Sequence, residues 1–555
     1  MSSPRHVALE RGATLRLAFA MRANTSGRES LVLALVLWAA LALLSSCMGG
    51  SDGTSTTSLD PPAEPEPPGE LPAFPFIDHV DQRNIRSGRI LFTELFTLGD
   101  VLFETAFTTL DGAGIARLPD GAALPSRFSR VPPGGGRLTG PNGQACVGCH
   151  NTPFPTSAGE IAGGVLQDPS GLGLPPFNSR SVISLFGSAV LQRLAEEMTE
   201  ALHAIRDEAA ARALPGGPPV TFDLEAKGVS FGRITAQRAS NDELTFDTSE
   251  VEGVDRDLVV RPYGWKGNVT TLRDFVRIAA SNEMGMEADE LVAKDGLARL
   301  DPDGDGVEGE LSIGDITALT IYIGAQPTPT SRDTLAARGL EPPPTAEVAR
   351  SRARGRALFD AIGCATCHVP ELVLEDTRFE EPTRRGRGAY IDDEIDAGES
   401  ALDPDAPFVF DLLIEGDPPR LEFRNGGGAI VRLFGDLKRH AMGAQLSDAQ
   451  PTPVRAASGR ALVLDGAPVS IAEAVFLTAE LWGVGNTGPW LHDGRAASLE
   501  EAILLHGVDA PPPPGSPDRS EAQEARDAFA ALTPSERTDV VEFLRSLVLV
   551  SFEED

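Results

Sequence analysis

Basic residues are scarce in this chain. Only 48 lysines and arginines stand against 81 aspartates and glutamates in 555 residues, which gives a formal net charge of −33 at pH 7. Phosphate backbones and anionic lipid surfaces repel such a chain over long range. The composition therefore argues against a nucleic-acid-binding protein. The acidic excess is that of a solvated exterior or, alternatively, of a surface that attracts a cationic partner such as a lysine-rich electron carrier.

The N-terminal apolar run is too short for a typical transmembrane helix. Residues 31–44 read LVLALVLWAALALL, follow Arg22 and Arg28, and lead into Ser45-Ser46-Cys47. A bilayer span needs about 20 apolar residues, whereas this order of charges, apolar run and small residues is that of a signal peptide. Small residues before Cys47 resemble the lipobox of bacterial lipoproteins, in which that cysteine is lipidated. The alternative is an uncleaved membrane helix, and both interpretations export the rest of the chain.

Cysteine is scarcer still, with only five in the chain. The spacing of these cysteines is more informative than their number. Two segments read Cys-x-x-Cys-His, at 146–150 (CVGCH) and 364–368 (CATCH). On a helical turn, sulfurs three residues apart lie on one face and can join the two vinyl groups of haem, while the next residue presents its imidazole to the iron. A structural zinc site is the alternative, but it leaves the repeated histidine unexplained. We predict two covalent c-type haems, attached through Cys146, Cys149, Cys364 and Cys367, with His150 and His368 as proximal iron ligands.

The remaining length suggests more than one hydrophobic core. Residues 48–76 are rich in serine, threonine, glycine, proline and glutamate, which favours an unfolded tether. The segment between Asp333 and Pro344 has a loop-like composition, which predicts a domain boundary near residue 340. We expect a signal peptide with lipobox at 1–47, a tether at 48–76, and haem domains at 77–340 and 341–555.

Helical signals flank the second motif. Ala349–Ile362 has apolar residues at helical spacing and ends before the motif, like the first helix of a cytochrome c domain. Ser535–Leu547 is amphipathic after a threonine-proline start signal and predicts a closing helix. Phe222–Ile234 alternates like a strand and predicts an inserted β-hairpin. We therefore expect a mainly α fold, made of two cytochrome c-like domains with inserted loops and short β-hairpins.

Five segments resemble a known family. They are Arg180–Leu194, Gly264–Gly285, Gly363–Leu372, Leu433–Gly443 and Leu481–Gly507. Their sequences resemble those of the bacterial di-haem oxidoreductases described as peroxidases. These are distant relatives of di-haem cytochrome c peroxidases and of methylamine-utilisation di-haem enzymes. The resemblance covers most of residues 80–550. It implies two facing cytochrome c-like domains, one haem relaying electrons and the other reacting with peroxide.

Histidine is scarce too, which limits the candidates for the second axial ligand of each iron. In the peroxidase relatives, a residue fourteen positions after the histidine of a His-x-Gly turn binds the C-terminal haem. Here 506 − 492 = 14, so the resemblance implies His506 as that ligand and a lower potential than methionine would give. The alternative is a helix-end histidine favoured by the helix dipole. His440 and Met442 are further candidates to approach iron, with packing as the alternative for each.

No histidine follows the first motif at the spacing of the peroxidase distal ligand, so the first haem is open or is ligated from elsewhere. Peroxide cleavage needs an acid/base group beside an open iron. Asn282–Gly285 resembles the peroxidase segment whose glutamate has this role, which makes Glu283 the candidate. The alternative is that Glu283 is one of many acidic residues on a solvated surface.

Other side chains are candidates for supporting roles. Arg495 is predicted to pair with a haem propionate, and His492 to pack in a turn beside the haem. Of Trp265 and Trp482, we select Trp482 as an electron path between the haems, with core packing as the alternative. The segment 301–306, DPDGDG, matches the opening of a calcium loop through Asp301, Asp303 and Asp305. Its twelfth position is serine, so this is not a regular EF-hand, and Glu308, Glu310 or Asp315 would complete the shell.

These signals predict a lipid-anchored protein of the periplasmic face of the outer membrane or of the cell surface. It would reduce hydrogen peroxide at the first haem, with electrons from a small redox carrier relayed by the second. The first alternative is a non-enzymatic electron-transfer cytochrome in which both irons are saturated. The second is an oxidase that withdraws electrons from a protein or organic substrate through the haem pair.

Overall fold

The structure is a computed structural model that describes residues 79–114, 143–159, 178, 180–292, 307–383, 402–403, 406–455 and 461–552. All of them lie in one unit, Pro72–Asp555. The predicted signal peptide with Cys47, the predicted tether, and the predicted calcium ligands Asp301, Asp303 and Asp305 lie outside the described residues. No helix within the described ranges is both long and apolar enough to cross a membrane.

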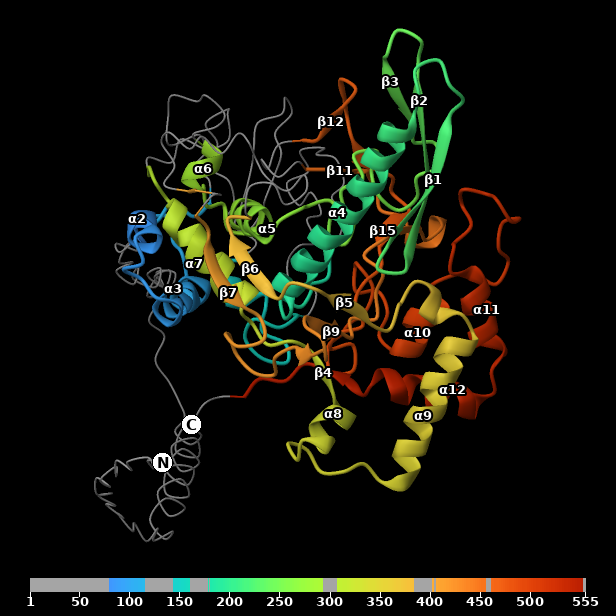
Figure 1. Ribbon diagram of the computed structural model, residues 1–555. Helices are drawn as coiled ribbons and strands as arrows, with labels where there is room; N and C mark the ends of the chain where they lie inside the picture. Colours follow the sequence, from blue (N-terminus) through green and yellow to red (C-terminus); the bar gives the residue numbers. More distant parts are fainter. Residues whose placement is uncertain are drawn as a thin grey trace, which may run out of the picture. The chain divides into compact units, whose positions relative to one another are not determined.

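Two helices cross beside the first motif. They are α3 (Phe92–Glu104) and α7 (Ile313–Gly324), which lie side by side (Figure 1). Gly99 lies at the crossing, where an added Cβ would overlap the backbone of α7. Only glycine permits so close an approach. One turn later, the ring of Phe103 lies 6.3 Å from the ring of His150, the proximal ligand predicted for the first haem.

The same arrangement occurs beside the second motif. Here α9 (Ala346–Ala361) crosses α12 (Pro534–Leu544), and an added Cβ on Gly355 would overlap the backbone of α12. One turn later, the ring of Phe359 lies 6.3 Å from that of His368, with the same interplanar angle of 50° as in the first half. The structure therefore places an equivalent helix pair, glycine and phenylalanine next to each Cys-x-x-Cys-His motif.

The glycine at the second crossing gives a testable prediction for stability. Gly355→Val should destabilise the protein by at least about 2 kcal/mol, because overpacking a tight contact costs about 1–3 kcal/mol or more and outweighs the small gain in helix propensity. The exposed Ala353→Val on the same helix is the control and should cost less than about 1 kcal/mol. Thermal unfolding of the haem-loaded variants measures both. Equal midpoints would contradict the close crossing.

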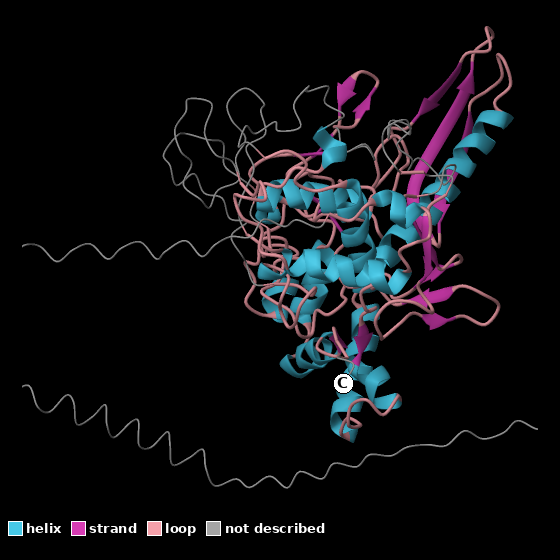
Figure 2. Cartoon of the chain, turned by 90° about the vertical axis from the view of Figure 1, so that its left-hand side faces the viewer, coloured by secondary structure: helices cyan, strands magenta, loops and turns pink. Residues whose placement is uncertain are grey.

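The prediction of a mainly α fold is wrong. Among the described residues, 33% are helical and 17% are in strands. The predicted hairpin is confirmed as β1 (Val220–Ala226) and β2 (Val229–Arg238), with Phe222 opposite Ile234, and β3 (Leu244–Asp247) extends it to the sheet β1-β2-β3. Figure 2 shows this sheet beside the long helix α4 (Ser188–Arg212), which packs against it.

The remaining strands are short and mostly join segments that are distant in the chain. They form one three-stranded sheet and several two-stranded sheets, with the following partners. The pairs are β4 (Thr330–Ser331) with β16 (Leu547–Val548), β6 (Arg378–Glu381) with β7 (Phe408–Asp411), β10 (Arg439–Ala441) with β15 (Val475–Leu477), β11 (Thr452–Pro453) with β14 (Ser470–Ile471) and β12 (Val463–Leu464) with β13 (Ala467–Pro468), and the triple is β5 (Leu372–Leu374), β9 (Ala429–Val431) and β8 (Glu422–Phe423).

The predicted helices around the second motif are confirmed as α9 and α12. Helix α9 ends before Gly363, whose positive φ of 91° suits glycine. Helix α12 starts with Thr533 as N-cap and a capping box, and ends at Leu544 rather than Leu547 because the following residues pair with β4. The other helices are α2 (Gln82–Arg86), α5 (Leu272–Ala279), α6 (Asp289–Val292), α8 (Arg332–Ala337), α10 (Leu499–Leu504), α11 (Gln523–Ala531), the 3-10 turns η1 (Cys146–Gly148), η4 (Cys364–Thr366) and η6 (Ala444–Leu446), and the π-helical turn η2 (Ala280–Met284).

The hydrophobic core consists of a large cluster, a smaller one, and a minor one of Ala209, Ala213 and Ala236 between α4 and β2. The large cluster joins α3, α4, α5 and α7 to strands β5, β6, β7 and β9, which follow residue 340 in the chain. The smaller cluster holds α9, α12 and the surroundings of the second motif. The large cluster thus contains residues from both sides of the predicted boundary near residue 340. The predicted domain ranges stay predictions.

Candidate functional site

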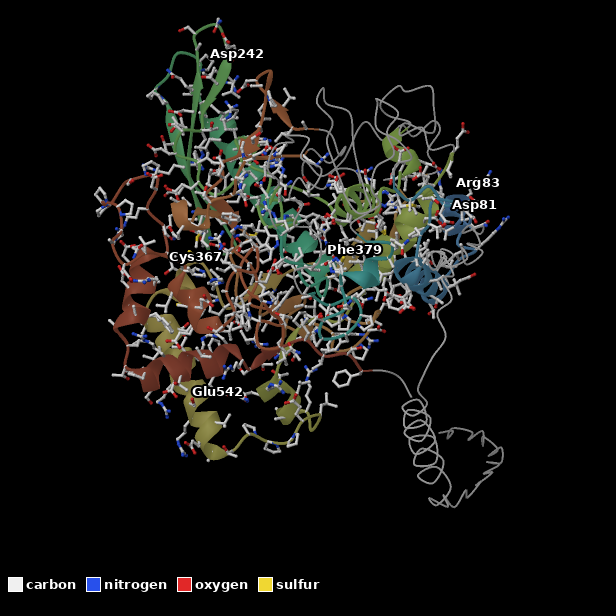
Figure 3. The ribbon with its side chains drawn as sticks, turned by 180° about the vertical axis from the view of Figure 1, so that it is seen from behind. Asp81, Arg83, Asp242, Cys367, Phe379 and Glu542 are labelled. Atoms are coloured by element: carbon white, nitrogen blue, oxygen red, sulfur yellow. The ribbon has the colours of Figure 1, made fainter. Side chains whose placement is uncertain are left out.

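A cavity of about 520 Å³ lies beside the second motif. Its volume is in the range of small-molecule and cofactor sites, about 300–1,000 Å³. Cys364, Cys367 and His368 line it, and Figure 3 shows Cys367 among the C-terminal elements. All five segments that carry the family resemblance contribute to its wall. Examples are Ser181, Trp265, Met442, Trp482 and His506.

Two histidines face each other across this cavity. The ring centroids of His368 and His506 are 6.4 Å apart. Nδ1 of His368 donates to the carbonyl oxygen of Phe434 at 3.0 Å, and Nδ1 of His506 donates to that of Ala502 at 2.8 Å. A carbonyl oxygen only accepts, so each Nδ1 carries the proton and each Nε2 keeps its lone pair for a metal. Two imidazoles on opposite faces of one iron would have centroids about 6.3 Å apart, given metal–nitrogen bonds of about 2.0 Å.

Burial keeps these histidines in the form that binds metal. Burial lowers the pKa of His368 to about 4 and also lowers the pKa of His506. Both rings are therefore neutral at physiological pH, as a metal-binding imidazole must be. The cavity, the paired cysteines and the opposed neutral imidazoles fit a haem with two axial histidines.

The pairing of His368 with His506 predicts a change of spin state. His506→Ala should turn the second haem from low-spin to high-spin, because one axial imidazole is lost, whereas His506→Met should keep it six-coordinate at a higher potential. Electron paramagnetic resonance of the oxidised protein and a redox titration measure the two effects. His203→Ala is the control, since Nε2 of His203 binds the carbonyl oxygen of Asp257 at 2.8 Å. An unchanged spectrum in His506→Ala would refute His506 as an axial ligand of the second haem.

The first motif has a different environment. Nδ1 of His150 donates to the carbonyl oxygen of Ser157 at 3.2 Å, and burial lowers the pKa of His150 to about 4, so this imidazole is also neutral. The other described histidines are engaged elsewhere: His79 with Asp315, His203 with Asp257, His440 and His492 with carboxylates, and His506 opposite His368. Among the described residues, no histidine is therefore left to bind the distal iron face at the first motif.

Glu283 lies near this first motif. It belongs to the π-helical turn η2, which follows α5 directly, and such turns are frequent at functional sites. The backbone carbonyl of Glu283 accepts a hydrogen bond from the backbone N–H of Gly143, just before the motif, at 3.1 Å. Burial, followed by the negative charge of Glu283, raises the pKa of the Cys149 thiol. The glutamate is thus exposed, as the alternative of a solvated carboxylate also requires, and lies within electrostatic reach of a predicted haem-attachment sulfur.

His440 does not have the geometry of an iron ligand. Its Nδ1 lies 2.7 Å from an oxygen of Glu521, and its Nε2 lies 2.9 Å from an oxygen of Asp436. Although burial alone would lower it, hydrogen bonds to Asp436, Cys367 and Glu521 raise the pKa of His440 to about 11. Carboxylates thus engage both ring nitrogens of His440, and in this arrangement neither nitrogen offers a lone pair to iron.

Zinc remains the alternative use of the cysteines, and the structure disfavours it. Cys367, Asp436 and His440 bring ligand atoms within 4.8 Å of one another. However, in the described part of the chain the four motif cysteines do not form a common group. A single zinc site built from both Cys-x-x-Cys pairs does not fit this arrangement.

The other predicted residues fall into two groups. Met442 and Trp482 line the cavity, and Nε1 of Trp482 donates to the carbonyl oxygen of Arg432 at 2.9 Å. Arg495 instead pairs with Asp493, with its Nε 2.7 Å from the carboxylate, and does not line the cavity. Its role toward a propionate stays a prediction. Asp315, one of the residues predicted to complete a calcium shell, caps α7 and pairs with His79 at 2.6 Å.

A buried charge network near the cavity was not predicted from the sequence. Nζ of Lys266, 1% exposed, lies 3.2 Å from Asp448, and Arg180 binds the same carboxylate through two hydrogen bonds of 2.8 and 2.7 Å. Nε2 of His492 lies 3.5 Å from it, and the His492 ring packs on Phe476 with centroids 4.3 Å apart. Losing one partner of such a group leaves a buried unpaired charge. A lysine inside a resembling segment was the only sequence signal.

Comparisons with known proteins cover part of the chain. Residues 413–547 match the model of the family described as "Di-haem oxidoreductase, putative peroxidase". A search of curated proteins finds no match. Among solved structures, hydrazine synthase of Kuenenia stuttgartiensis is 13% identical, with a TM-score of 0.31, over 90% of this chain and 100% of that chain. A MauG-like protein associated with microbial copper homeostasis is 17% identical, with a TM-score of 0.23, over 56% of this chain and 76% of that chain.

Likeness to the two solved structures at this level supports no conclusion about mechanism. The family match spans His440, Met442, Trp482, His492 and His506, which all line the cavity. It therefore supports haem as the cofactor of the cavity. The C-terminal part of this chain is similar to the di-haem oxidoreductases.

Proposed function

We propose that this protein is an exported di-haem c-type oxidoreductase that reduces hydrogen peroxide at the haem of Cys146 and Cys149. Cys364, Cys367 and His368 would hold a second haem, whose one-electron chemistry would supply the electrons. The observation that carries the proposal is the asymmetry between the two motifs: His506 opposes His368 at 6.4 Å, whereas every other described histidine is engaged away from His150. One site is built for electron transfer and the other for reaction.

The chain's own residues have defined tasks in this scheme. Haem, when bound, supplies a one-electron redox centre whose reactivity depends on an open iron face. Neutral His150 and His368 hold the two groups from the proximal side. The carboxylate of Glu283 takes a proton from one peroxide oxygen and returns it to the other, so that the O–O bond breaks with water as leaving group. In total, hydrogen peroxide, two electrons and two protons give two molecules of water.

The setting of the protein completes the proposal. Lipidation of Cys47 would anchor it to the periplasmic face of the outer membrane or to the cell surface, with residues 48–76 as tether. The electrons would come from a small one-electron carrier protein. A calcium ion would bind through Asp301, Asp303 and Asp305, which lie between α6 and α7 in the sequence. Mass spectrometry of the mature N-terminus and calcium analysis of the purified protein test these two additions.

Steady-state turnover tests the main proposal. Purified holoprotein should oxidise two equivalents of a reduced one-electron donor, such as reduced cytochrome c, for each hydrogen peroxide added, at a rate that depends on enzyme concentration. An electron carrier would exchange electrons with the donor once and then stop. Absence of peroxide-dependent turnover with several donors, in protein that holds both haems, would overturn the proposal.

A further inference from the structure

We propose that Glu480 is the proton-binding group of the cavity beside the second motif: its carboxylate binds one proton when the haem there gains an electron and releases it when the electron leaves. The inference rests on the haem in this cavity, which is part of the proposed function, and not on peroxide as the substrate. Neither the family resemblance nor the spacing of the motifs singled out this residue.

The position of Glu480 is fixed by its backbone. It lies in the extended segment after β15, where the backbone N–H of Thr478 donates to the carbonyl oxygen of Lys438 at 3.0 Å and that of Leu481 donates to Leu433 at 3.1 Å. These bonds hold the segment on both sides of the glutamate. Glu480 itself lines the cavity, as do Cys367 and His368. A carboxyl group is thus held at the wall of the compartment that fits haem.

The side chain of Glu480 has no ion pair or hydrogen bond from another residue in the part of the chain that the structure describes. Burial raises the pKa of Glu480 to about 7, opposed only by a hydrogen bond from its own backbone. No other charged group contributes to this shift. Such a carboxyl is poised to change its charge at physiological pH.

Charged groups on the surrounding segments are engaged with other partners. Asp436 binds His440, Arg432 binds Glu422, and Lys438 binds Glu252 at 3.0 Å. The remaining titratable or charged residues that line the cavity are Tyr263, Cys364, Cys367, His368, His440, His492, His506, Glu521, Glu524 and Arg526. Burial lowers the pKa of His368, His492 and His506, so these imidazoles stay neutral, while His440 stays charged between two carboxylates. Glu480 is therefore a lining carboxyl whose pKa of about 7 falls in the physiological range.

The physical basis is electrostatic coupling in a poorly solvated compartment. An added electron brings a negative charge, which disfavours the carboxylate and raises the pKa of Glu480 further. Between the two pKa values, each electron from the external reductant is accompanied by one proton from solvent, which converts the carboxylate to the neutral acid. Electron loss reverses both changes. The potential of this haem then falls as pH rises, by at most 59 mV for each tenfold change in proton concentration.

A spectroelectrochemical titration of the full-length holoprotein, from about pH 5 to about pH 9, tests the inference without any peroxide. In the wild type, the potential of one haem should fall with pH around neutrality. Glu480→Gln should abolish this slope and hold the potential at its higher, acid-side value, because the amide mimics the protonated acid. Glu480→Asp should keep the slope. The exposed Glu225→Gln on β1 is the control and should match the wild type.

An infrared difference spectrum gives a second reading of the same event. Reduced-minus-oxidised spectra near pH 7 should show a protonated carboxyl band in the wild type that is missing in Glu480→Gln. A wild-type potential that does not depend on pH, or a slope that persists in Glu480→Gln, would overturn the inference. Failure of peroxide turnover alone would contradict the proposed function, but it would not affect the inference about Glu480.

Discussion

Replacing Cys364 and Cys367 together by alanine is expected to leave the protein with one covalent haem instead of two. Both sulfurs line the cavity that His368 and His506 face, so this change removes the covalent link at that site alone. Intact-mass spectrometry and the haem-to-protein ratio measure the loss. Steady-state peroxide reduction should fall to background, because electrons no longer reach the first site.

The matched control is the double variant Cys146→Ala/Cys149→Ala. It should also hold one haem, but the remaining one should show the spectrum of a six-coordinate centre with two axial histidines. Together the two variants assign each spectrum to its motif. Two haems in either variant, or zinc in place of haem in the wild type, would contradict the attachment sites.

Replacing Glu283 by glutamine is expected to lower kcat for peroxide by about 10²- to 10⁴-fold, the usual contribution of a positioned acid/base group. The carboxylate acts on Cys149 electrostatically, and its turn is tied to the segment before the first motif. Glutamine keeps the size of the side chain but cannot take up the proton. Stopped-flow mixing of the half-reduced protein with peroxide measures the effect on the chemical step.

Two controls accompany the prediction for Glu283→Gln. Glu225→Gln removes an exposed carboxylate on β1 and should leave kcat unchanged. The haem content and the resting spectrum of Glu283→Gln should equal those of the wild type, so that a loss of rate reports on proton transfer. A decrease of less than about threefold would mean that the exposed Glu283 takes no part in proton transfer and that another acid/base group is required.

Much of the chemistry was predictable because it is local. The spacing within each Cys-x-x-Cys-His motif, the helix that ends before Gly363, and the Thr533 start of α12 are all encoded within a few residues. The hairpin of β1 and β2 was predictable for the same reason. His506 came from a spacing carried by the family resemblance, and the structure then placed it opposite His368.

The mainly α prediction failed because the missed strands are not local. Pairs such as β4 with β16 and β10 with β15 are two or three residues long and join distant segments, so no alternating pattern marks them. Lys266 and Glu480 were missed for a related reason. A charged residue is expected to be exposed when only the sequence is known, and only tertiary packing buries Lys266 and brings the half-buried Glu480 to the wall of the cavity.

The most direct test of the account is the electron paramagnetic resonance and visible spectrum of the purified protein, oxidised and half-reduced, before and after hydrogen peroxide is added. One low-spin haem with two axial histidines and one high-spin haem whose signal peroxide consumes are expected. Two low-spin haems that peroxide leaves unchanged in both redox states would contradict this expectation.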